Sequence, residues 1–292
     1  MEYSDLYADI AERTGGDIYI GVVGPVRTGK STLIKRFMEL MILPEINDEA
    51  FGRRARDELP QSAAGRTIMT TEPKFVPEQA VRLELDGGIE LRARMIDCVG
   101  YLVPGAMGHE EGERPRMVKS PWFDEEVPFD TAAEMGTRKV ICEHSTIGLV
   151  VTTDGSISDI PRENYLEAEQ RVIEELEAIH KPFVILLNCV APQAPESLAL
   201  AGRLQEKYGH AVLPVSCAEM TEETIHEVLR QVLLEFPVKE LAFAMPKWVT
   251  MLSPEHWLQQ ELYSAVREYA EGISAMRDLT DGAGPACPSI QE

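Results

Sequence analysis

Apolar runs of strand length alternate along the chain with segments whose apolar residues recur at helical spacing. This alternation is typical of βα units that build a mostly parallel sheet. The first apolar run, residues 18–23, precedes a helical segment that we expect to end near Pro44. The sequence is then polar and without periodicity to about Thr71, which predicts a long loop.

A β-hairpin is predicted next, because two alternating runs flank Asp86-Gly87-Gly88. Glycines readily adopt the positive φ angles that a tight hairpin turn requires. The runs span residues 81–85 and 89–96, so one antiparallel strand is expected to join the sheet. Residues 101–128 are rich in Gly, Pro and charges and are too long for an ordinary connection, which predicts a functional or disordered loop.

Helical and strand patterns continue to alternate to about residue 236. We expect helices at residues 129–144, 162–180 and 198–208, and a further helix that ends at about residue 236. Strands are expected at residues 146–153, 183–188 and 211–216. These elements complete a six-stranded nucleotide-binding domain over residues 1–237.

The pattern changes beyond Pro237. An apolar stripe from Leu258 to Met276 predicts one more helix, and a breaker cluster at residues 281–285 precedes a polar tail. The stripe fits two alternatives, a helix packed on the first domain or the start of a second domain. Residues 238–292 are therefore predicted to form a helical extension or the beginning of that second domain.

The amino-acid composition limits which kinds of partner and which cellular compartment fit this chain. The chain has 49 acidic and 28 basic side chains and a net charge of −21, which argues against a nucleic-acid partner. Its 5 cysteines stand singly, which fits a reducing compartment. The first residues lack the order of a signal peptide, and no apolar run approaches the length of a transmembrane segment. A cytoplasmic location is predicted.

The candidate chemistry begins with GPVRTGKS at residues 24–31, which matches G-x-x-x-x-G-K-[ST] between a predicted strand and a predicted helix. Backbone N–H groups of such a P-loop surround the β-phosphate of a nucleotide at a helix N-terminus. Lys30 is expected to contact the β- and γ-phosphate oxygens, and Ser31 to bind Mg²⁺. The predicted nucleotide-binding residues are Gly24, Arg27, Thr28, Gly29, Lys30, Ser31, Thr32, Gly100 and Asn188.

Two further segments complete the predicted triphosphate site. Asp97-Cys98-Val99-Gly100 follows the second hairpin strand, where a P-loop protein needs a carboxylate for the metal shell and a glycine N–H for the γ-phosphate. Thr70 or Thr71 is expected to complete the Mg²⁺ shell, although either threonine taken singly also fits a strand start. The predicted metal ligands are Ser31, Thr70, Thr71 and Asp97.

The catalytic residues predicted from these motifs are Lys30, Asp97, Thr70, Thr71 and Arg27. Arg27 lies inside the P-loop and is a candidate arginine acting in cis on the phosphates. A solvent-facing or phosphate-steering role is the alternative for this side chain.

The order of these motifs is that of the translation-factor-like GTPases, with two departures. The guanine-reading N-K-x-D motif is replaced by Asn188-Cys189-Val190-Ala191, and alanine cannot accept the hydrogen bonds of the guanine edge. Guanine specificity is therefore predicted to be lost, in favour of adenine. Tyr101 stands where many such GTPases carry a water-orienting glutamine, so catalysis needs another polar group or is slow.

Taken together, the motifs resemble the stage IV sporulation protein A family. The similarity rests on the P-loop and on residues 15–19, 59–77, 97–101 and 143–148, and it extends from about residue 9 to about residue 278. Members of that family are cytoskeleton-like ATPases of endospore-forming bacteria, and they polymerise on the forespore surface as the base layer of the spore coat. The resemblance implies phosphate binding by Lys30, a metal-linked role for Asp97, and nucleotide sensing by Thr70 and Thr71.

The resemblance also implies ATP and Mg²⁺ as cofactors, and a place in the mother-cell cytoplasm, peripheral on the forespore surface and in the spore coat. The implied partners are further copies of the chain, a small amphipathic membrane-bound peptide and other spore-coat proteins. Family members continue beyond this chain through later domains that contribute to assembly, whereas residues 282–288 do not resemble them. This suggests a truncated or frameshifted gene product.

We therefore expect a chain that hydrolyses ATP without building stable polymers by itself. Two other functions fit the residues: a regulatory GTPase, and a structural protein that binds nucleotide with negligible turnover.

Overall fold

A computed structural model describes residues 16–46, 49–60, 72–85, 89–108, 110–111 and 114–279. The chain divides into two compact units, one ending at Val232 and the other beginning at Leu233. Helix α7 (Glu222–Leu234) crosses this division. Among the described residues, no helix is both long and apolar enough to cross a membrane.

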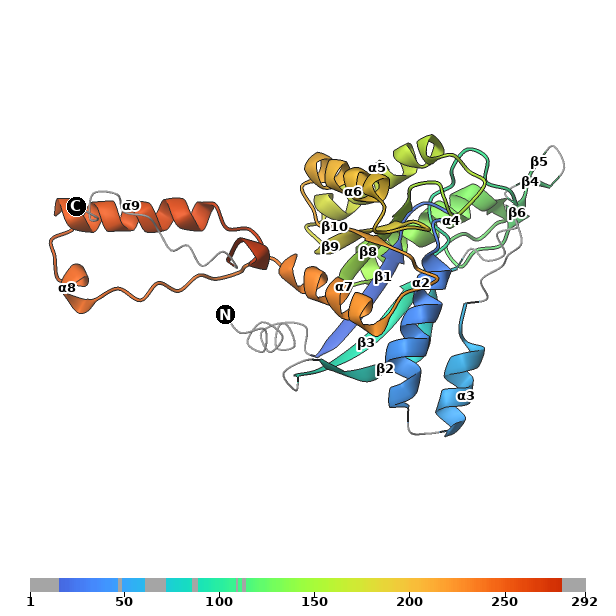
Figure 1. The fold of residues 1–292 in the computed structure, drawn as a ribbon, viewed down its shortest axis with the longest axis horizontal. Coiled ribbons are helices and arrows are strands. Elements are labelled where there is room, and N and C mark those ends of the chain that lie inside the picture. Colours follow the sequence, from blue (N-terminus) through green and yellow to red (C-terminus); the bar gives the residue numbers. More distant parts are fainter. Residues whose placement is uncertain are drawn as a thin grey trace. The chain divides into compact units, whose positions relative to one another are not determined.

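The first unit is built on one six-stranded sheet with the strand order β10-β9-β8-β1-β3-β2 (Figure 1). Five strands are parallel, and β2 alone runs antiparallel, against β3. This confirms the predicted fold class, a P-loop NTPase fold with a mostly parallel six-stranded sheet. The strands are β1 (Asp17–Val23), β2 (Lys74–Leu85), β3 (Ile89–Asp97), β8 (Ile147–Thr153), β9 (Phe183–Asn188) and β10 (Val212–Val215).

The central strands are buried along their whole length, since every side chain of β8 and β9 is buried. Parallel strands of this kind need helices on both faces of the sheet. One core cluster joins β8 and β9 to α5 and α6, and includes Leu176, Phe183 and Leu204. The helices of this unit, besides α7, are α2 (Lys30–Phe37), α3 (Glu49–Asp57), α4 (Phe129–Lys139), α5 (Leu166–Ala178) and α6 (Pro195–Tyr208).

Two helices of the sheet-bearing unit continue as tighter or wider turns. After α2 a π-helical turn (Met38–Ile42) and a 3-10 turn (Leu43–Glu45) carry the chain past Pro44, near the predicted end. A second π-helical turn (Val140–His144) extends α4 to the predicted boundary. A 3-10 turn (Arg162–Tyr165) begins the segment that α5 continues.

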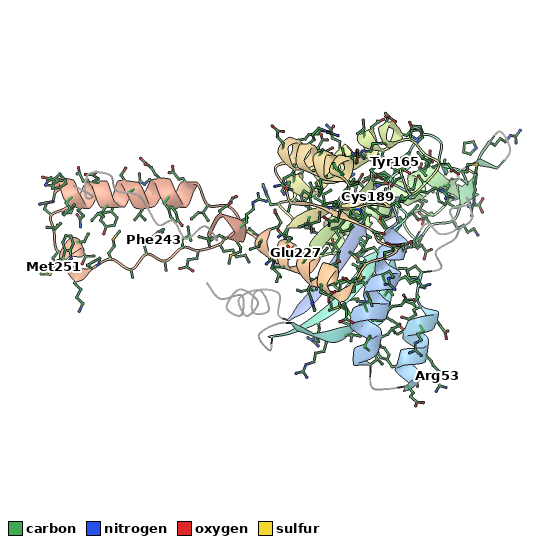
Figure 2. All side chains as sticks on the ribbon, in the orientation of Figure 1. Arg53, Tyr165, Cys189, Glu227, Phe243 and Met251 are labelled. Carbon is green, nitrogen blue, oxygen red and sulfur yellow. The ribbon has the colours of Figure 1, made fainter. Side chains whose placement is uncertain are left out.

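Helix α3 corrects the prediction of one long loop before Thr71. Ala55 is its one buried residue, and Arg54 and Arg56 are exposed, as is Arg53, which Figure 2 labels. A helix with a single buried position produces no apolar period in the sequence, which is why the pattern did not reveal it. The remainder of the predicted loop, residues 61–71, lies outside the described residues, as does the predicted turn at residues 86–88.

The segment predicted as one long connection, residues 101–128, contains two short antiparallel ladders. They pair β4 (Glu110–Glu111) with β5 (Arg114–Pro115), and β6 (Met117–Val118) with β7 (Val127–Pro128). Strands of two residues are too short to leave an alternating pattern, so the sequence could not distinguish them from loop.

The second unit contains α8 (Lys247–Thr250), α9 (Trp257–Glu271) and a 3-10 turn (Met276–Leu279). The predicted helical extension is confirmed, but its helix ends at Glu271 and not at Met276. Met276 instead donates its N–H to the carbonyl oxygen of Phe236 at 2.9 Å, and Arg277 pairs with Glu235 at 2.5 Å. This return of the chain within the unit replaces the last predicted helical turn.

Candidate nucleotide-binding site

The P-loop connects the carboxyl end of β1 to the first turn of α2, as its motif requires. Gly29 has a φ of 95°, and a Cβ atom there would lie 2.2 Å from the side-chain nitrogen of Asn188, so a larger residue does not fit. Within the described part of the chain, the N–H groups of Lys30 and Ser31 donate to no other group. Unpaired donors at a helix N-terminus are the arrangement that binds phosphate.

Lys30 lies folded against the loop that precedes it. Its Nζ donates to the carbonyl oxygens of Pro25 at 2.5 Å and Gly24 at 3.3 Å, and the residue is 5% exposed. Burial lowers the pKa of Lys30, and the neighbouring Cys98 and Asp97 partly offset this shift. A cation in such a poorly solvated position interacts strongly with an anion placed next to it.

Ser31 and Asp97 meet at the end of β3. The Ser31 hydroxyl donates to Asp97 Oδ2 at 3.0 Å, whereas Asp97 Oδ1 is buried and has no hydrogen-bond partner among the described residues. Burial raises the pKa of Asp97, and the charge of Lys30 and the hydrogen bond from Ser31 act against that shift. An unsatisfied buried carboxylate oxygen beside a hydroxyl fits a Mg²⁺ ion that also binds phosphate oxygens.

In the described part of the chain, no three His, Cys, Asp or Glu side chains converge as a metal site would require. Of the four predicted metal ligands, Ser31 and Asp97 are among the described residues. The other two predicted ligands, Thr70 and Thr71, lie outside the described residues.

Gly100 lies directly on the P-loop. Its φ is 94°, and a Cβ atom there would lie 2.2 Å from the Gly24 carbonyl oxygen and 2.6 Å from Lys30 Nζ. The N–H of Gly100 donates to the hydroxyl of Thr137 on α4, at 3.1 Å. The sequence predicted the approach of Gly100 to the phosphates but gave no sign of Thr137.

Tyr101 points away from the predicted γ-phosphate position. Its hydroxyl donates to Glu175 at 2.5 Å, the guanidinium of Arg171 lies 4.1 Å from its ring centre, and the residue is 2% exposed. Its carbonyl oxygen accepts the N–H of Val26 in the P-loop, at 2.9 Å. Tyr101 thus packs on α5 and is not available to orient water.

Asn188 links the P-loop to the ends of two strands. Its amide nitrogen donates to the carbonyl oxygen of Thr28 at 2.9 Å, and its amide oxygen accepts the N–H of Cys217 at 3.0 Å. Cys189, where the guanine reader has lysine, is fully buried, and Val190 is 64% exposed. This edge of the site therefore offers neither a lysine side chain nor the carboxylate of N-K-x-D.

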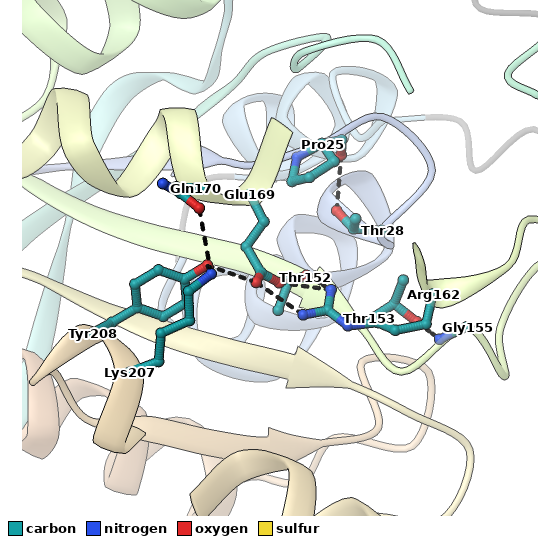
Figure 3. A network of polar contacts seen from close by, with 10 residues as sticks. All are labelled: Pro25, Thr28, Thr152, Thr153, Gly155, Arg162, Glu169, Gln170, Lys207 and Tyr208. Atoms are coloured by element: carbon teal, nitrogen blue, oxygen red, sulfur yellow. Dashed lines mark hydrogen bonds and ion pairs between the residues drawn. The ribbon is translucent and has the colours of Figure 1, made fainter. Parts of the chain in front are cut away.

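A network of polar contacts holds the loop after β8, and Figure 3 shows it in the same view as the Thr28–Pro25 contact of the P-loop. At its centre the fully buried Glu169 of α5 accepts hydrogen bonds from Arg162 at 2.8 Å, Tyr208 at 3.0 Å and Thr152. The sequence did not reveal Glu169, because it stands in a helix with several other glutamates.

The remaining predicted residues lie on the P-loop and on α2. Thr28 is buried and Thr32 is half-buried in the first turn of α2. Arg27 has a positive φ of 62° and is half-buried. Burial raises the pKa of Tyr165, and the charge of Arg27 acts against it, so Arg27 lies within electrostatic range of that phenol. The structure thus describes every predicted residue of the site except Thr70 and Thr71, and their roles stay predictions.

Comparison with known proteins gives consistent matches along the chain. The family model described as "Stage IV sporulation protein A, ATPase domain" matches residues 1–237, and the one for the middle domain of the same protein matches residues 238–287. Stage IV sporulation protein A of Bacillus anthracis is 55% identical over 279 residues, and that of Clostridioides difficile is 49% identical over 276 residues.

These alignments cover 96% and 94% of this chain, but 57% and 56% of the two relatives. The chain thus spans little more than half the length of the relatives it matches. Among solved structures, a variant of SsGBP is similar at 14% identity and a TM-score of 0.42, over 80% of this chain and 64% of that one. This similarity is too weak to inform the function.

Proposed function

Since this chain belongs to the stage IV sporulation protein A family, we propose that it is a magnesium-dependent ATPase of sporulating cells. The observation that carries the proposal is the P-loop geometry within the region matched by the family's ATPase domain. The support comes from the unpaired N–H groups at the start of α2, the buried Lys30 and the Ser31–Asp97 pair, which are groups that a bound triphosphate with Mg²⁺ requires. We propose residues 1–237 as the ATPase domain and residues 238–292 as the start of a second domain.

In the proposed site, Ser31 and Asp97 would hold Mg²⁺ together with the phosphate oxygens, and Thr70 and Thr71 would complete its shell. The ion would neutralise charge that develops on the phosphates during transfer to water. Lys30 would leave its two loop carbonyl oxygens to contact the β- and γ-phosphates. Arg27 is retained as a candidate for stabilising charge on the bridging oxygens.

The residues at the positions of the guanine-reading motif support ATP over GTP as the substrate. Asn188 uses both ends of its amide within the protein, and the position of the guanine-reading carboxylate holds Ala191. We expect ATP to displace a labelled adenine nucleotide at concentrations at least tenfold below those required of GTP, because Ala191 gives the guanine edge no paired acceptor.

The experiment is a displacement titration with both nucleotides, run beside steady-state phosphate release with and without Mg²⁺. Equal displacement by GTP would contradict the preference for adenine and favour a regulatory GTPase. Tight ATP binding without phosphate release would instead favour a structural protein that binds nucleotide.

We further propose that ATP hydrolysis serves self-association in the base layer of the spore coat, on the forespore surface in the mother cell, although this chain by itself is expected to form no stable polymer. The support for this role is membership of the family. A small amphipathic membrane-bound peptide and other coat proteins are the proposed partners. Sedimentation of the chain with and without ATP, at several salt concentrations, tests whether the residues of this chain carry an assembly contact.

A further inference from the structure

We propose that Thr137 is a positioning residue that holds the N–H of Gly100 when no γ-phosphate is bound, and thereby sets how strongly the site prefers ATP over ADP. The inference rests on the proposed function, since it needs a triphosphate at the P-loop. It goes beyond that function because it assigns nucleotide discrimination to a hydroxyl on α4, outside every motif of the site.

The contacts of the Thr137 hydroxyl carry the inference. It is fully buried, donates to the carbonyl oxygen of Ala133 at 2.8 Å, and accepts the N–H of Gly100 at 3.1 Å. Gly100 is itself buried, and a Cβ atom there would collide with the Gly24 carbonyl oxygen and Lys30 Nζ. Thr137 thus gives a buried backbone donor its partner at the place where the γ-phosphate would approach.

Two acceptors then compete for one donor. Without a γ-phosphate the N–H of Gly100 stays on Thr137, and with ATP bound a phosphate oxygen replaces the hydroxyl. A buried N–H left without either acceptor is unfavourable, so the hydroxyl stabilises the nucleotide-free and ADP-bound protein relative to the ATP-bound protein. Removing it should therefore strengthen ATP binding and leave ADP binding unchanged.

Neighbouring contacts confine the change of acceptor to the N–H of Gly100. The segment after Gly100 remains attached to the P-loop through Val26 N–H and the Tyr101 carbonyl oxygen, and Tyr101 is fixed on α5 by Glu175. The hydroxyl of Thr137 is the contact that joins Gly100 to α4. Exchange of its acceptor would therefore break this one hydrogen bond to α4, while the segment from Asp97 to Gly100 stays attached to the P-loop through Tyr101.

The test compares Thr137→Val with Thr137→Ser by equilibrium binding of ADP and of a non-hydrolysable ATP analogue. Valine keeps the shape of threonine without the acceptor, whereas serine keeps the acceptor. We expect Thr137→Val to bind the ATP analogue about tenfold more tightly, with unchanged ADP affinity. This is the effect expected when the γ-phosphate supplies an acceptor to one buried N–H that has none in the unliganded variant. Thr137→Ser should match the wild type. If Thr137→Val does not fold, Thr137→Ala carries the same expectation.

A merely structural role would weaken both nucleotides or neither, so a selective gain for the triphosphate separates the two explanations. An unchanged ratio of ADP to ATP-analogue dissociation constants in a folded Thr137→Val variant would overturn the inference and leave the proposed ATPase intact. Failure of the wild-type chain to bind either nucleotide would overturn both.

Discussion

Lys30→Ala is expected to lower the affinity for ATP by on the order of a thousandfold, because it removes charge-assisted contacts to two phosphate groups. Among the described residues, Lys30 is the lysine that lies at the P-loop carbonyl oxygens, 2.5 Å from that of Pro25. Its burial means that water screens its charge poorly, which increases the loss when the charge is removed. Equilibrium binding of a fluorescent ATP analogue measures the effect.

The matched control is Lys35→Ala on the outer side of the same helix. Lys35 has a side chain that is 41% exposed and lies 3.8 Å from Glu39, so its loss changes a surface ion pair only. We expect ATP affinity close to that of the wild type. A folded Lys30→Ala variant that binds ATP as the control does would show that the P-loop is not the nucleotide site.

The sheet could be predicted because its signals are local. The apolar run of β9 has the predicted bounds, since all of its side chains are buried between helices and no competing pattern interrupts it. The antiparallel strand followed from two alternating runs near each other in sequence. Helix α3 and the short ladders left no such signal, because one buried alanine or two paired residues do not make a period.

The arrangement of the P-loop and of the segment after β3 could be predicted for a similar reason. The P-loop and the segment from Asp97 to Gly100 are contiguous motifs whose chemistry fixes their residue types. Thr137 and Glu169 could not be found in this way, because they act across the fold. Thr137 lies 37 residues from Gly100 in sequence, and a threonine within a helix has no distinguishing neighbours. Such contacts follow from the packing of α4 and α5 on the sheet.

Among the described residues, the proposed metal site rests on one pair of side chains, Ser31 and Asp97. The pair presents Asp97 Oδ1 as a buried acceptor without a partner among the described residues. If Asp97 Oδ1 binds a cation, the negative charge of the carboxylate matters more than the shape of the side chain. A substitution that keeps the shape and removes the charge is therefore the informative one.

Asp97→Asn is accordingly expected to slow phosphate release from ATP by about a hundredfold or more, the usual effect of removing one preorganised electrostatic group. ATP affinity should change far less, because Lys30 and the N–H groups of α2 remain in place. Raising the Mg²⁺ concentration should recover part of the rate, since the amide weakens a metal site without blocking it. Asp57→Asn, at the exposed end of α3, is the control and should leave the rate unchanged. If Asp97→Asn releases phosphate at the wild-type rate and with the wild-type dependence on Mg²⁺, Asp97 does not bind the metal. Packing alone would then explain why Asp97 Oδ1 has no hydrogen-bond partner among the described residues.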